Sequence, residues 1–277
     1  GDCYEVQSQP AGFRKAVIFG EELVRVRGYE VRLPLKGVKQ FCVYGQYKDK
    51  YPQKLYVRVG KFSHLSQEVP ELYYHEDGYM VSYDEERERL CVRKKHALPH
   101  LVKELRLLLR CVRNKRYEIA GYRCLYHLIK PFLRKERWIV MERINVAGDN
   151  AEHFFKFLQK QGNRDIKSYF TISEDSDDFE KMRKIGRVLP FRKFRYKLNV
   201  LLAKNIISSQ GEDNIFNPWD KDSVYIRDLY KYHFVFLQHG IIKDDLSEWL
   251  NKFNKNLQMF VTSAKPEYES ILQGDYF

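Results

Sequence analysis

The second half of the sequence alternates short apolar stretches with amphipathic ones, and this alternation restricts the fold most strongly. Each apolar stretch is rich in β-branched and aromatic residues and is short, which favours a strand over a buried helix. Strands that alternate with helices are typical of βαβ units, in which helices cover both faces of a parallel sheet. The predicted strands occupy residues 137–143, 165–173, 187–191, 205–210, 233–238 and 257–263, and the predicted helices 149–161, 175–186, 193–204, 223–231 and 264–273. We therefore predict an α/β fold with a Rossmann-like parallel sheet over residues 136–277.

The first part of the chain has a different pattern. Short alternating runs rich in Val, Tyr, Phe and Leu extend from about residue 13 to residue 92, and Gly and Pro separate them. Asp77-Gly78 stands between two apolar runs, which is a common hairpin signal. These features predict a small all-β accessory domain, sandwich-like, over residues 1–96.

Residues 97–135 form the third predicted part, a basic helical segment. Between Arg93 and Arg137 there are 14 basic residues and three acidic ones, an excess of 11 in a chain whose net charge is +12. Two interpretations stay open: the apolar face packs on a neighbouring sheet, or the helix lies on an anionic bilayer, where each nearby Lys or Arg contributes roughly 1 kcal/mol. Apolar residues that recur at steps of three and four define that face: Leu98, Leu101, Val102, Leu105, Leu108, Leu109 and Val112.

Charge and cysteine content limit the class of protein. The basic excess indicates an anionic partner, which is nucleic acid, phospholipid or a phosphorylated substrate. The five cysteines are odd in number, widely spaced and never in CxxC pairs, so we predict neither a disulfide framework nor a metal site, and a reducing cytoplasm fits best. No stretch approaches 18 uncharged apolar residues, so we predict no membrane-spanning segment.

The stretches that follow predicted strands hold the candidate functional residues, because ligands of open parallel sheets bind outside the carboxyl ends of the strands. His239 carries an imidazole that can take or give a proton near neutral pH, and Gly240 permits a close approach of backbone to ligand. We therefore predict His239 as a general base for a hydroxyl nucleophile. The other candidates for substrate binding at this edge are Asp149, Asn150, Ser208, Ser209 and Gln238.

Each of these motifs also has a structural interpretation that the sequence leaves open. A histidine at this position can cap a strand and hydrogen-bond a loop carbonyl. Asp149 and Asn150 can cap the helix that follows them, which is a common role for these residue types.

Taken together, several stretches resemble the CDP-glycerol glycerophosphotransferase family, which builds teichoic acids and related poly(glycerol phosphate) polymers of bacterial cell walls. The resemblance covers roughly residues 136–277, in order and spacing, through "DNAEHFFKFL", "SYFTISEDSDDFEKMRKIGRVLPF", "LLAKNIISS", "FNPW", "FVFLQHGIIKDDLSEWLNK" and "MFVTSAKPEYESIL". Its most distinctive element is an HG-x-x-K-x-D-x-S arrangement, formed here by His239, Gly240, Lys243, Asp245 and Ser247.

The resemblance implies the acceptor-side half of a two-domain GT-B transferase at the cytoplasmic face of the membrane. Such an enzyme moves glycerol phosphate from the donor CDP-glycerol to a terminal hydroxyl of a lipid-linked acceptor and releases CMP, and the resemblance implies no further cofactor. His239 inherits the role of general base, and Lys243 meets phosphate charge. Asp149 and Asn150 line the acceptor side or hold His239 in place. The basic segment 97–135 then faces an anionic membrane surface, and the protein is peripheral on its inner face.

The chain also departs from that family, because the nucleotide-binding half that follows in the family lies outside these 277 residues. We expect little transferase activity from this chain alone. Two alternatives remain: a non-catalytic module that binds a polyanion or a membrane, and a nucleic-acid binder. Against nucleic acid, the sequence has no RNP, KH or zinc-finger pattern, and its basic residues adjoin a Leu stripe. The sequence does not distinguish a glycerol from a ribitol donor, or a primase from a polymerase.

Overall fold

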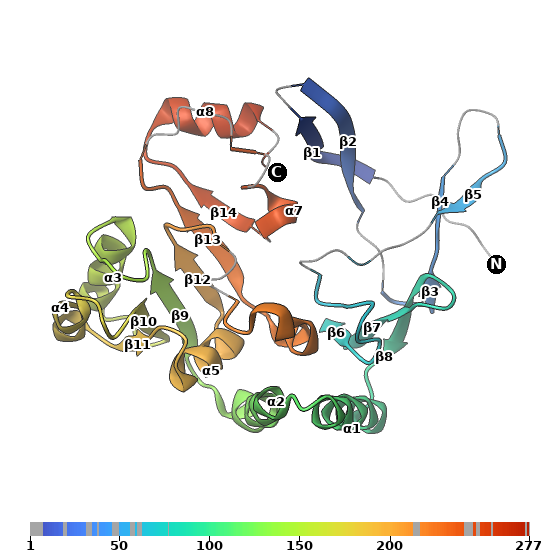
Figure 1. Ribbon diagram of the computed structural model, residues 1–277, viewed down its shortest axis with the longest axis horizontal. Helices are drawn as coiled ribbons and strands as arrows, with labels where there is room; N and C mark the ends of the chain where they lie inside the picture. The colour runs from blue at the N-terminus through green and yellow to red at the C-terminus, as the bar shows by residue number, and fades with distance from the viewer. Residues whose placement is uncertain are drawn as a thin grey trace. The chain divides into compact units, whose positions relative to one another are not determined.

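The computed structural model comprises two compact units that interleave along the sequence (Figure 1). The first unit contains residues 1–33, 134–216 and 232–277, and the second contains residues 34–133 and 217–231. The structure describes residues 8–18, 21–31, 35–37, 39–45, 50–55, 59, 63–76, 78–212, 217–240, 246–247, 250–255, 257–274 and 276.

The first unit is built on a six-stranded parallel sheet, whose strands lie side by side in Figure 1. Its order is β11-β10-β9-β12-β13-β14, and all five pairings between neighbours are parallel. This is the doubly wound order of dinucleotide-binding folds, numbered 3-2-1-4-5-6 along the chain. The predicted α/β fold with a Rossmann-like parallel sheet is therefore confirmed. The strands are β9 (Glu136–Met141), β10 (Ile166–Ile172), β11 (Val188–Pro190), β12 (Asn205–Ser208), β13 (His233–Leu237) and β14 (Leu257–Val261).

Helix α3 (Asn150–Gln161) packs on the sheet through a core cluster that includes Val140, Phe155 and Phe170. It begins because Asp149 has an extended backbone and its carboxylate accepts the Asn150 N–H, and it ends at Gly162, whose φ of 58° only glycine adopts easily. The other helices of this unit are α4 (Phe179–Ile185), α5 (Phe194–Leu202), α7 (Lys252–Lys255) and α8 (Lys265–Gln273). Helix α4 begins four residues later than predicted, because residues 175–178 form turns.

Antiparallel strands account for the N-terminal pattern. The hairpin β1 (Ser8–Ile18) and β2 (Glu21–Val31) lies within the first unit. The second unit holds the sheet β3-β8-β7-β6 and the pair β4-β5. The predicted turn next to Gly78 joins β6 to β7, and Gly78 has a φ of 78°, while Asp77 lies outside the described residues. Strands of the second unit are β3 (Gln40–Phe41), β4 (Val43–Gly45), β5 (Gln53–Leu55), β6 (Tyr73–Glu76), β7 (Tyr79–Asp84) and β8 (Arg89–Lys94).

Two α-helices and three 3-10 helices complete the described part of the second unit. Where the sequence predicts a short helix at residues 223–231, the chain forms two 3-10 helices, η2 (Asp220–Tyr225) and η3 (Arg227–Leu229), which belong to one unit with residues 34–133. The basic segment contains α1 (Ala97–Arg113), α2 (Tyr117–Ile129) and η1 (Lys130–Phe132). None of the described helices is long and apolar enough to span a bilayer. The division of the chain into residues 1–96, 97–135 and 136–277 stays a prediction.

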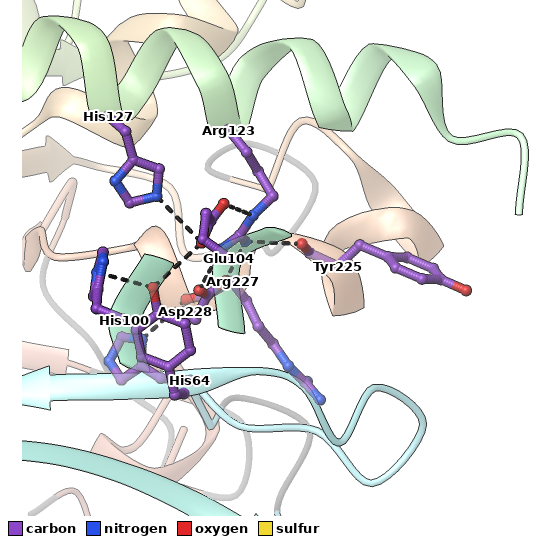
Figure 2. Close-up of polar contacts among 9 residues, drawn as sticks. His64, His100, Glu104, Arg123, His127, Tyr225, Arg227 and Asp228 are labelled. Atoms are coloured by element: carbon purple, nitrogen blue, oxygen red, sulfur yellow. Dashed lines mark hydrogen bonds and ion pairs between the residues drawn. The ribbon is translucent and has the colours of Figure 1, made fainter. Parts of the chain in front are cut away.

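A buried arginine holds the elements of the second unit together (Figure 2). Arg123 on α2 is fully buried, and its guanidinium donates to the carboxylates of Glu104 and Asp228 at 2.7–2.8 Å and to the carbonyl of Tyr225 at 3.0 Å. Burial alone would raise the pKa of Glu104, but hydrogen bonds from His127 and Arg123 hold that pKa well below its ordinary value. One side chain thus ties α1, α2 and the 217–231 segment.

Candidate functional site

The carboxyl ends of three neighbouring strands meet at one edge of the parallel sheet. β9 ends at Met141, β12 at Ser208 and β13 at Leu237. The strand order changes direction between β9 and β12, because β10 lies on the other side of β9. In open α/β sheets, ligands bind outside the carboxyl ends of strands at such a switch point. The loops after these three strands are therefore the candidate site.

Strand register shows which side chains at this edge lie on the face of the sheet that α3 covers. Met141 pairs with Ser208, and Ser208 pairs with Phe236. Because side chains alternate along a strand, the following residues project to the opposite face. Among them, Leu237 belongs to the core cluster beneath α3. Glu142 and Ser209 are at the same register position as Leu237, so both lie on the α3 side of this edge.

Asn150 links the first loop to the third. Its side-chain amide donates to the backbone carbonyl of Gln238, the residue before His239. The structure therefore brings Asn150 and His239 to the same edge of the sheet, as expected for residues that follow parallel strands. Asp149 is the N-cap of α3 and Asn150 is its first residue, so the capping interpretation is correct for Asp149. It does not explain the contact of the Asn150 side chain with Gln238.

His239 lies on the exposed rim of the sheet, outside the apolar core. Its backbone N–H donates to the side-chain oxygen of Gln238 at 3.0 Å, and its ring meets Phe236 edge to face at 6.4 Å. Gly240 has a φ of 157° and no atom within 4 Å of an added Cβ. Among the described residues, no hydrogen bond joins the imidazole to a loop carbonyl. The ring is thus accessible, and its role as a base stays a prediction.

The two serines at the end of β12, Ser208 within the strand and Ser209 directly after it, are fully buried and differ in their contacts. The Ser208 hydroxyl accepts the Gln210 N–H at 2.9 Å, so it shapes the turn that follows the strand. The backbone N–H of Ser209 donates to Met141 at 3.3 Å, while its hydroxyl has no hydrogen-bond partner within the described part of the chain. Of the two, Ser209 has the free hydroxyl, and a ligand role for either serine stays a prediction.

The remaining residues of the HG motif are only partly described. Lys243 and Asp245 lie outside the described residues. Ser247 is buried, and its carbonyl accepts the side-chain amide of Asn251 at 2.6 Å.

A buried carboxylate at this edge escaped the sequence analysis. Glu142 directly follows β9, is 1% exposed, and accepts backbone N–H groups of Gly148 at 2.7 Å, Asp149 at 3.3 Å and Glu152 at 3.2 Å. Burial raises the pKa of Glu142 above its ordinary value, and these three hydrogen bonds offset only part of that rise. In the sequence, Glu142 directly follows the apolar run "WIVM", a place where a charged residue is usually solvated.

A second carboxylate supports the same loop. Asp178 accepts the Ala147 N–H at 2.9 Å, and this hydrogen bond is the main cause of its lowered pKa. Within the described ranges, no group of three or more His, Cys, Asp or Glu residues is arranged to hold a metal ion.

The fold and this edge define a Rossmann-type α/β protein with an exposed histidine at the carboxyl-end edge of its parallel sheet. The chain is similar to the minor teichoic acid biosynthesis protein GgaB of Bacillus subtilis (strain 168), with 35% identity over 276 residues. That alignment covers 94% of this chain and 30% of the length of GgaB. It confirms the predicted resemblance to a protein of teichoic acid synthesis. No protein-family model matches the chain, and the comparison with solved structures found no match.

Proposed function

We propose that the chain forms the acceptor-side half of a glycerophosphotransferase of teichoic acid synthesis. The observation that carries the proposal is the rim formed by His239 and Asn150 at the switch point of the sheet. The similarity to GgaB supports the polymer class. CDP-glycerol as donor, a lipid-linked polyol phosphate as acceptor and a GT-B arrangement rest on the sequence resemblance.

In the proposed reaction, His239 takes the proton of the acceptor's terminal hydroxyl. The hydroxyl oxygen forms a bond to the β-phosphorus of CDP-glycerol, and the bond between that phosphorus and the bridging oxygen breaks, so CMP leaves with the electron pair. Positioning and positive charge near the departing phosphate supply most of the rate enhancement in such transfers. Lys243 is the proposed source of that charge on this chain.

Replacement of His239 tests the proposal. His239→Ala, in the protein at its native length, is expected to lower the rate of CMP release by roughly 10²–10⁴-fold, which is the usual contribution of a general base. The matched control is His233→Ala, because His233 is an exposed histidine at the opposite end of the same strand. A near-normal rate for His239→Ala would remove His239 from the mechanism. Assay of the 277-residue chain alone tests whether it acts without further residues.

A second proposal concerns location at the inner face of the membrane, and a specific feature of α1 supports it. Six large apolar side chains of α1 are exposed, from 43% at Val102 to 75% at Leu98. The buried side of the helix instead carries Glu104, Leu107 and Cys111. At 100° per residue, the exposed stripe lies about 140° around the helix from this buried side. The exposed set is Leu98, Leu101, Val102, Leu105, Leu109 and Val112.

Basic residues flank this exposed stripe. Arg106 and Arg113 are exposed along one edge of it, and Lys115 and Arg116 follow the helix. An outward apolar stripe with a cationic border is the pattern of helices that lie in the interface of an anionic bilayer. The same surface would serve the alternative function, a non-catalytic module bound to a membrane, so activity and vesicle binding have to be measured separately.

A further inference from the structure

We propose that Glu142 is a positioning residue that sets the place of His239 through the first turn of α3 and Asn150. The inference rests on the proposed function, because it concerns the same histidine. Its physical basis is a path of hydrogen bonds, joined by short stretches of the chain, from a buried carboxylate to the backbone that carries the imidazole.

The path begins at the N-terminus of α3. The first N–H groups of a helix have no partner within the helix, and their dipoles favour a negative charge. Here the two oxygens of Glu142 accept the N–H groups of Gly148, Asp149 and Glu152. A carboxylate that binds three donors of one turn fixes the position of that turn relative to the end of β9.

Through these contacts, the carboxylate of Glu142 binds the N-terminus of α3. In dinucleotide-binding folds, this place after the first strand receives the diphosphate of the ligand. In this chain the internal carboxylate of Glu142 fills it, 1% exposed. The charge of this carboxylate opposes a phosphate at the same place, so we assign the turn a role in orientation and not in anion binding.

The path continues through Asn150 to the histidine. The Asn150 amide, fixed with its turn, holds the Gln238 carbonyl, and the Gln238 side chain in turn accepts the His239 N–H at 3.0 Å. Hydrogen bonds behind a functional group hold it within about 0.5 Å of its working position. A displacement of about 1 Å can lower a rate by about 10²-fold. Loss of the Glu142 charge should therefore act on His239 without any direct contact.

The first test follows the imidazole itself, without any activity. In the 277-residue chain with isotope-labelled histidine, Glu142→Gln is expected to shift the ring signals of His239 and to leave those of His233 unchanged. Asn150→Ala cuts the path one step later and is expected to shift the same signals, so it carries the test if Glu142→Gln fails to fold. The matched control is Asp178→Asn, which removes the other carboxylate that holds this loop, at Ala147.

The second test is kinetic and uses the protein at its native length. Glu142→Gln is expected to lower kcat for CMP release by about 10²-fold and to leave KM for CDP-glycerol within about twofold. His239 signals that stay in place in both path variants, or that move equally in Asp178→Asn, would overturn the inference. An unaffected rate in His239→Ala would instead overturn the proposed function. The displacement of the His239 ring in Glu142→Gln and Asn150→Ala could still be observed in that case.

Discussion

At the scale of single residues, the candidate site depends on a buried carboxylate and a side-chain amide whose hydrogen bonds lie behind one exposed ring. Glu142 and Asn150 make backbone contacts that fix two loops, while His239 alone presents a titratable group to solvent among these three. This division of roles is expected where a functional side chain must stay accessible and the groups behind it must not move.

Glu142 should make the stability of the chain depend on pH in an unusual direction. Its native pKa is raised, so between the unfolded pKa and the native pKa the folded state binds more protons than the unfolded state. The free energy of unfolding therefore falls as the pH rises through this window. Glutamine does not titrate, so the stability of Glu142→Gln relative to the natural chain is expected to increase from acid toward neutral pH.

Urea denaturation at a series of pH values measures this difference. Glu180→Gln is the matched control, because Glu180 is an exposed glutamate on α4 whose only described ion pair is with Arg183. A stability difference for Glu142→Gln that stays constant with pH, or that falls as the pH rises, would contradict the raised pKa.

The sequence predicted the residues at the rim, His239 and Asn150, but not Glu142, the buried carboxylate behind them. His239 and Asn150 could be assigned to one edge because the carboxyl ends of parallel strands meet there, which depends only on the order of strands and helices. Glu142 was missed because a charged residue after a strand is usually solvated, and only the fold shows that a helix N-terminus receives it. Lys243 and Asp245 lie outside the described residues, so the structure adds nothing to their prediction.

At the scale of elements, α1 shows what periodicity can and cannot predict. The repeat correctly indicated an apolar face, but it could not tell whether another element covers that face. The structure leaves the face exposed within the described residues, and the contacts to the core come from Leu107 and Cys111, which the predicted face omitted. Within the described residues, no neighbouring sheet covers this stripe of α1.

Charge placed in the stripe should abolish membrane binding without unfolding the chain. Leu105 and Leu109 are 50% and 68% exposed, so replacement of both by Glu is expected to cost little stability. Burial of a leucine in the bilayer interface contributes up to about 1.5–3 kcal/mol, so the double variant is expected to bind vesicles that contain phosphatidylglycerol at least about 30-fold more weakly. Co-sedimentation at physiological salt measures the binding.

The control for this experiment is Leu272→Glu, which places a charge at a 63% exposed leucine on α8. It should leave vesicle binding unchanged. Equal binding of the α1 double variant and the natural chain would exclude the stripe as the docking surface. Stronger binding to an oligonucleotide than to vesicles, at the same salt, would favour the nucleic-acid alternative.

At the scale of the whole molecule, the chain leaves the parallel sheet after β12 and returns to it at β13. In between, residues 217–231 join the second unit. Local patterns could not predict this excursion, because its short helical turns look like any connection between two strands. Long-range contacts decide it, and the buried pairing of Arg123 with Asp228 spans 105 positions of the sequence.

Loss of Arg123 should therefore release the 217–231 segment. Arg123→Met fills much of the same volume but leaves the carboxylates of Glu104 and Asp228 buried without their cation. Removal of one partner from a buried ion pair costs about 3–5 kcal/mol. Backbone amides of residues 220–229 are expected to exchange with deuterium at least about 10²-fold faster, as mass spectrometry of peptides would measure.

An exposed arginine that holds the same segment provides the control. Arg116 pairs with Asp222 of η2 at 3.1 Å, and their side chains are 44% and 35% exposed. Exposed ion pairs contribute about 0–1 kcal/mol because water and salt screen them, so Arg116→Met is expected to change exchange in this segment by less than about fivefold. If both variants had the same small effect, the segment would depend on its apolar contacts, such as those of Val224 and Tyr225 with the cluster around Leu107, and the ion pairs would be secondary.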